Sequence, residues 1–238
     1  MNYTVNIIGI GKIGRKVLDE IKEDDYKVLL KKSYANLIDN KVISFTYNIN
    51  KIYYDKEIVI NEKPRYNIII YDNKDKLIAK DLVDKIGNVE YLNIGISING
   101  SDDIPNVKVV ETSIENVSQS ILNLLQLTLE RPSMISYDLN DINDFFNRYA
   151  KYEIINIDGI NDYDSNDIIK RIEKYKNNRI EILFIMSYVN TYNSLLYLYE
   201  LFTPIWELDN FETSYGKWHF TFPSLINNNY LTMLIGIK

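Results

Sequence analysis

Short apolar runs alternate with amphipathic segments along the first half of the chain. The runs predict buried strands at residues 5–10, 26–31, 66–71, 91–98 and 107–110. Two further runs, at 42–47 and 52–60, predict short strands or a hairpin. The amphipathic segments, with apolar residues every three or four positions, predict helices at 15–22 and 75–86. Strands that alternate with helices form a mostly parallel sheet covered on both faces, so we predict an α/β fold with a Rossmann-type N-terminal sheet.

The helix expected at 75–86 is followed by a glycine. Ile78, Leu82 and Ile86 share one side of it and are expected to face the sheet. Gly87 is expected to end the helix, because glycine readily adopts the backbone conformation that follows a last helical turn.

A long central helix is predicted from Thr112 to Arg131. Its residues are apolar on nearly every side, which is typical of a helix that is buried all round. Thr112 and Glu115 have the spacing of a capping box at its start, and Pro132 ends it.

The second half predicts a smaller α/β domain. Helices are expected at 141–149, 165–175 and 191–202, and strands at 152–157, 179–186, 211–222 and 230–237. The chain therefore divides into a nucleotide-binding-like domain (1–111), the central helix (112–132) and a C-terminal domain (133–238).

Composition excludes several classes of protein. The 238 residues include no cysteine, which removes disulfides and thiolate metal sites and fits a cytoplasmic protein. The net charge of −6 gives little reason to expect nucleic acid as a partner. Because no apolar run approaches the length of a membrane-spanning helix, and the N-terminus lacks the features of a signal peptide, we expect no membrane span.

The first strand runs into a glycine turn with the pattern G-x-G-x-x-G. Gly9, Gly11 and Gly14 supply it, and Lys12 adds a positive charge. Such a turn lets the backbone approach a phosphate at a helix N-terminus. A tight strand-to-helix turn without a ligand explains the same glycines.

The stretch after the central helix resembles the FtsZ/tubulin superfamily. The family has a loop with two aspartates after the core helix, and here the loop reads Ser136-Tyr137-Asp138-Leu139-Asn140-Asp141-Ile142. Both aspartates match, whereas Ser136 stands where the family has asparagine. The order of strands and helices matches along the whole chain. The resemblance implies a tubulin/FtsZ-like fold with a long central helix between two α/β domains.

The resemblance also implies a function. In that family the glycine turn holds the phosphates of GTP with Mg²⁺, which here implies Gly9, Gly11, Lys12 and Gly14. Asn116, at the start of the central helix, would face guanine. Asp138 and Asp141 would act on the nucleotide of the next subunit in a head-to-tail filament. A role in the cytoskeleton or in cell division is the corresponding expectation, with a second copy or an FtsZ/tubulin-like protein as partner.

The chain departs from the family where a second, glycine-rich loop should bind phosphate. After the strand ending at Tyr71 it has Asp72-Asn73-Lys74-Asp75-Lys76, without a glycine. Side chains keep the backbone away from a phosphate, and two carboxylates repel it. GTP binding is therefore expected to be weak, altered or lost.

Two other functions fit the sequence. One is a nucleotide-independent structural or regulatory module with a tubulin-like fold. The other is an NADP-dependent reductase, because Lys31, Lys32 and Ser33 follow the second predicted strand, where a 2′-phosphate is bound in such enzymes. For the loop acids the alternative is structural: Asp138 or Asn140 caps the next helix, and Asp141 favours its first turn.

Overall fold

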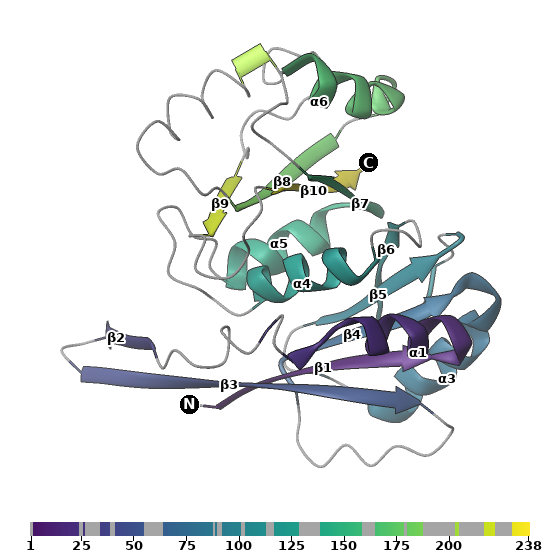
Figure 1. The fold of residues 1–238 in the computed structure, drawn as a ribbon, viewed down its shortest axis with the longest axis vertical. Helices are drawn as coiled ribbons and strands as arrows, with labels where there is room; N and C mark the ends of the chain where they lie inside the picture. Colours follow the sequence, from purple (N-terminus) through teal and green to yellow (C-terminus); the bar gives the residue numbers. More distant parts are fainter. Residues whose placement is uncertain are drawn as a thin grey trace. The chain divides into compact units, whose positions relative to one another are not determined.

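The computed structural model describes residues 2–23, 26, 34–38, 41–54, 64–87, 89, 92–100, 103–112, 117–128, 139–158, 165–178, 180–187, 203–204, 217–221 and 230–238 (Figure 1). The chain forms two compact units, Met1–Leu129 and Glu130–Lys238.

The first unit is built on a mostly parallel sheet, as predicted. Its strands, in spatial order, are β2 (Tyr34–Ile38), β3 (Lys41–Tyr54), β1 (Asn2–Ile10), β4 (Tyr66–Asp72), β5 (Leu92–Ile98) and β6 (Lys108–Thr112). β2 is antiparallel to β3, and the other neighbouring strands run parallel. The central β4 and β5 are buried along their whole length, which explains their continuous apolar runs.

Helices cover both faces of this sheet. α1 (Gly11–Glu20) buries Gly14, Val17 and Leu18. After the short helix η1 (Asn73–Asp75), α3 (Lys76–Ile86) packs its buried residues against alternate positions of β1 and β4, including Ile8 and Ile69. Gly9 faces α1 and Ile8 faces α3, and successive residues of a strand point to opposite faces. The predicted stop at Gly87 is confirmed, with φ of 71°.

Two details of the first unit were predicted wrongly. The runs at 42–47 and 52–54 belong to one strand, β3, because the polar residues between them fit within the sheet; residues 55–60 lie outside the described part. Ile78 does not face the sheet: 43% of it is exposed, whereas Ala79, Leu82 and Val83 are buried. These three residues already form a complete inner side of α3 at helical spacing.

The central helix is described as α4 (Val117–Thr128). Val117, Ile121, Leu124 and Leu125 are buried, and so are the polar residues Ser120 and Asn123. Thr112, expected to begin this helix, is instead the last residue of β6, paired with Ile98. Residues 113–116 and 129–132 lie outside the described part, as does most of the strand expected at 26–31.

A row of asparagines crosses the first sheet. Asn50 Nδ2 donates to Asn6 Oδ1 (3.1 Å), Asn6 Nδ2 to Asn67 Oδ1 (3.0 Å) and Asn67 Nδ2 to Asn93 Oδ1 (2.9 Å). These residues lie at paired positions of β3, β1, β4 and β5. A slip of one residue would turn an asparagine to the other face and leave its neighbours unpaired, so the row fixes the register of the strands.

We predict that Asn67→Leu lowers the free energy of unfolding by about 3 kcal/mol, because it leaves a donor of Asn6 and an acceptor of Asn93 buried and unpaired. Asn50→Leu, at the exposed end of the row, should lower it by about 1 kcal/mol. Urea unfolding followed by far-ultraviolet circular dichroism measures both. Equal losses would show that the row does not act as proposed.

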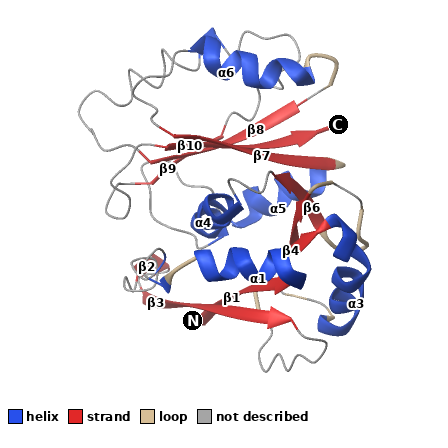
Figure 2. Ribbon diagram, turned by 45° about the vertical axis from the view of Figure 1, so that its right-hand side comes forward, coloured by secondary structure: helices blue, strands red, loops and turns tan. Residues whose placement is uncertain are grey.

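The second unit contains a smaller, mixed sheet. Its strands, in spatial order, are β7 (Lys151–Asp158), β10 (Tyr230–Ile237), β8 (Ile180–Ser187) and β9 (Lys217–Thr221). β10 is antiparallel to both neighbours, and β9 is parallel to β8. Figure 2 shows α5 (Leu139–Arg148) and α6 (Ser165–Ile172, followed by the short helix η4, Glu173–Tyr175) on opposite sides of these strands. The helix expected at 191–202 lies outside the described residues.

A buried carboxylate on β8 binds two side chains at the end of α5. Glu181 is only 2% exposed, and its Oε2 accepts hydrogen bonds from Arg148 Nη1 (2.8 Å) and from the hydroxyl of Tyr149. The neighbouring Tyr152 hydroxyl donates to the carbonyl oxygens of Phe146 (2.5 Å) and Tyr149 (2.9 Å). Burial raises the pKa of Tyr152 well above its usual value, so this donor stays protonated.

We predict that Arg148→Leu lowers the free energy of unfolding of the second unit by about 3 kcal/mol, because it leaves a buried carboxylate without its cation. Lys174→Leu breaks the more exposed ion pair with Glu153 and should change stability by less than about 1 kcal/mol. Tryptophan fluorescence reports this transition, since both tryptophans, Trp206 and Trp218, lie in the second unit. Similar losses in the two variants would contradict the assignment.

Candidate functional site

The glycine turn at the end of β1 is required by packing. A Cβ on Gly9 would lie 2.5 Å from the carbonyl oxygen of Gly14, and a Cβ on Gly14 would lie 2.5 Å from that of Ile70. Both distances are far below van der Waals contact, so these glycines let α1 lie directly on β1 and β4. Gly11 has φ of +65°, a conformation that favours glycine. Thus the fold itself accounts for all three glycines.

A carboxylate stands at this turn. A Cβ on Gly11 would lie 2.2 Å from Oδ2 of Asp75, so the Asp75 side chain occupies the space beside the first residue of α1. Asp75 also immediately precedes α3. A negative charge is favourable at a helix N-terminus, and here one carboxylate lies near two of them. A phosphate bound at the start of α1 would have to share this region with Asp75.

The turn that carries Asp75 is fixed in place. Oδ1 of Asp72 accepts from the backbone N–H of Lys74 (3.1 Å), and Oδ2 accepts from Nδ2 of Asn99 (3.1 Å). Asn73 packs against Gly100, which has φ of +146°. These contacts connect the turn after β4 to the turn after β5. They lie at the carboxyl ends of parallel strands, the edge at which open α/β sheets bind ligands.

The other predicted nucleotide-site residues lie in separate elements or outside the described part. Lys12 is exposed on α1. Asp141 lies in the first turn of α5, in the second unit. A negative charge there stabilises the helix, because the N-terminal end of a helix carries a partial positive charge. Asp138, Asn116 and the Lys31–Ser33 segment lie outside the described residues, so the roles expected for them stay predictions.

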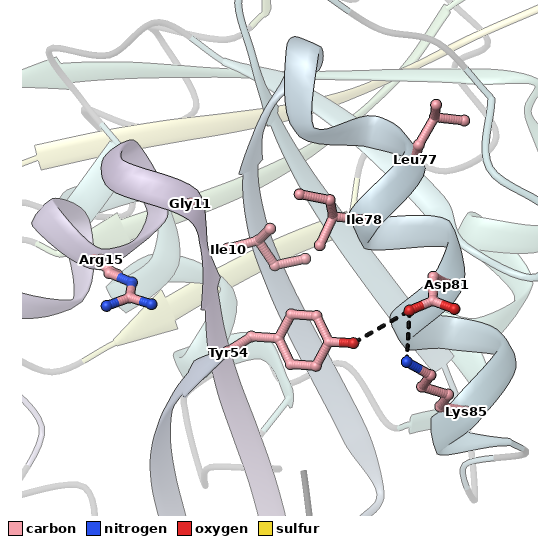
Figure 3. Close-up of a pocket in the computed structure, with 8 residues that line it drawn as sticks. All are labelled: Ile10, Gly11, Arg15, Tyr54, Leu77, Ile78, Asp81 and Lys85. Atoms are coloured by element: carbon pink, nitrogen blue, oxygen red, sulfur yellow. Dashed lines mark hydrogen bonds and ion pairs between the residues drawn. The ribbon is translucent and has the colours of Figure 1, made fainter. Parts of the chain in front are cut away.

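A cavity of about 420 Å³ opens beside the glycine turn, within the first unit. Its lining residues are Ile10, Gly11, Arg15, Tyr54, Leu77, Ile78, Asp81 and Lys85 (Figure 3). Ile10 and Ile78 point toward each other in Figure 3, and the ring of Tyr54 points toward Asp81. The sequence did not predict this cavity: Ile78 was expected to face the sheet, and instead it lines the cavity together with Leu77.

The polar wall of the cavity is an ion pair with a tyrosine. Oδ2 of Asp81 accepts from Nζ of Lys85 (2.7 Å) and from the Tyr54 hydroxyl (3.3 Å). The hydrogen bond from Lys85 lowers the pKa of Asp81, and the same bond raises the pKa of Lys85. Both groups therefore stay charged near neutral pH.

Within the described ranges, no three His, Asp or Glu side chains gather closely enough to hold a metal ion. No helix of the described part is both long and apolar enough to cross a bilayer.

The fold is similar to that of several solved structures. An FtsZ dimer from M. jannaschii matches with a TM-score of 0.60 and 9% sequence identity, over 100% of this chain and 89% of that one. CetZ from Methanosaeta thermophila matches with a TM-score of 0.54 and 9% identity, over 97% and 85%. A GTPγS-form protofilament of TubZ from Bacillus thuringiensis serovar israelensis matches with a TM-score of 0.55 and 9% identity, over 99% and 86%. No protein-family model and no curated protein matches the sequence. The chain therefore has the FtsZ/tubulin-like fold that its sequence predicted.

We predict that Asp75→Asn lowers the free energy of unfolding by about 1 kcal/mol, because it removes a charge from beside two helix N-termini. Asp84→Asn is the matched control: this exposed acid lies in the last turn of α3, where removing a negative charge should be neutral or slightly stabilising. Urea unfolding at low and high salt measures the difference, which should shrink as salt increases. An Asp75→Asn variant as stable as the wild-type chain, or an equal loss of stability in Asp84→Asn, would contradict the role given to Asp75.

Proposed function

We propose that this chain is an assembly subunit with an FtsZ/tubulin-like fold that associates head to tail with its own copies or with a filament-forming relative, and does so without GTP. The observation that carries the proposal is the Asp75 carboxylate beside Gly11. It lies where the phosphates of a nucleotide would approach the backbone at the start of α1.

Charge and shape both disfavour a nucleotide there. A triphosphate carries several negative charges, and a nearby carboxylate repels them in a partly buried setting, where screening by solvent is weak. The turn from Asp72 to Asp75 contains no glycine and is held by Asn99, so its backbone is not free to wrap a phosphate. The residues present therefore do not fit GTP and Mg²⁺, and we assign the chain no hydrolytic step.

The assembly part of the proposal draws on the structural neighbours. They include a dimer of FtsZ and protofilaments of TubZ. A head-to-tail contact joins two different surfaces, so it can repeat into an open filament. In this proposal Asp138 and Asp141 contribute to a subunit contact or to the start of α5 and do not act on a nucleotide.

Sedimentation and phosphate release test the proposal together. The purified full chain is incubated over a range of concentrations with GTP and Mg²⁺, with GDP, with GTPγS and without nucleotide. We expect assembly that rises with protein concentration, equal under all four conditions, and no release of phosphate above a protein-free blank. Asp138→Ala and Asp141→Ala should leave the rate of phosphate release at that same background.

Two outcomes would overturn different parts of the proposal. Turnover of GTP that disappears in Asp138→Ala would show an active GTPase and refute nucleotide independence. A chain that stays monomeric at high concentration, and does not sediment with filaments of an FtsZ or TubZ protein, would refute assembly.

A further inference from the structure

The cavity beside the glycine turn has the properties of a small-molecule site. Its volume of about 420 Å³ lies within the range of roughly 300–1,000 Å³ that is typical of ligand pockets. Ile10, Leu77, Ile78 and Tyr54 form the apolar part of its lining, with Asp81 and Lys85 on one side and Arg15 on the other (Figure 3). Such pockets bind by apolar contact and orient the ligand through a few polar groups.

Exposed apolar side chains mark the same place. Among the described residues, the large hydrophobic side chains that are exposed are Tyr53, Leu77 and Ile78. Leu77 is 78% exposed and Ile78 43%, and both line the cavity. A ligand in the cavity would remove this apolar surface from water, which is favourable.

The charges around the cavity determine which ligand fits. Oδ2 of Asp81 is engaged by Lys85 and Tyr54, whereas Oδ1 accepts no hydrogen bond from the described residues. A ligand hydroxyl or N–H could donate to that oxygen. Two cations, Arg15 and Lys85, also line the cavity, and Lys85 is paired with Asp81.

We infer that this cavity binds a ring-sized apolar molecule that carries one hydrogen-bond donor, with Leu77 and Ile78 covering the apolar part and Asp81 accepting from the donor. The inference does not depend on assembly, because all of its residues lie within the first unit.

Saturation-transfer NMR on the full chain tests it with two probes, phenol and toluene. We expect saturable binding of phenol with a dissociation constant on the order of millimolar, and weaker binding of toluene, which lacks the hydrogen-bond donor. Failure of phenol to bind, or binding of toluene as tight as that of phenol, would overturn the inference.

Two variants locate the site. Ile78→Trp should fill the cavity and abolish phenol binding. Lys80→Trp is the control: it adds the same ring at an exposed position of α3 that does not line the cavity, and it should leave phenol binding unchanged.

Asp81→Leu, at an exposed position, should weaken the binding of phenol about tenfold through the loss of a charge-assisted hydrogen bond, and it should leave the binding of toluene unchanged. If Ile78→Trp binds phenol normally, or if Asp81→Leu affects both probes equally, the assignment is wrong. Signals of α3 that shift with protein concentration alone would show that a second copy covers the cavity, which also refutes it.

Discussion

The close approach of α1 to the sheet is the constraint on which the first unit depends. Gly9 and Gly14 bring the backbone of α1 against β1 and β4, and any side chain at either position would collide with a carbonyl oxygen. This contact sets where α1 begins and therefore where its N-terminus points. Lys51 fixes the other end by donating from Nζ to the carbonyl oxygen of Ile21 (2.7 Å). With both ends held, the start of α1 becomes a defined place for a negative charge.

In this chain that negative charge comes from the protein itself. Asp75 provides a carboxylate at the site where a related fold could hold a phosphate, and the surrounding turn is braced by Asp72 and Asn99. An internal anion is always present, whereas a bound one comes and goes. The start of α1 therefore carries its own negative charge, and the assembly proposed above needs no nucleotide there.

The sequence predicted the fold better than the site. The spacing of apolar residues and the positions of glycines identified β1, β4, β5, α1 and α3, because each of these elements buries residues at regular intervals along the sequence. It failed at β3, where Asn50, which resembles a break in the apolar pattern, donates a hydrogen bond to Asn6 of the neighbouring strand. It also failed at Ile78, since spacing alone cannot show which of two overlapping apolar faces meets the sheet. The contact of Asp75 with Gly11 joins two segments distant in sequence; the acids were recognised as unfavourable to phosphate, but their position required the structure.

The asparagine row also has a consequence for the order in which the chain can fold. Its bonds join residues 44, 61 and 26 positions apart, so none can form within a local hairpin. The row is complete only after Asn93 has joined strands from the beginning of the chain. Folding dominated by such distant contacts is slow, because loop closure must precede the stabilising interactions. During synthesis, β1 would therefore leave the ribosome before its neighbours β3 and β4, and its apolar residues would need protection from aggregation until those strands emerge.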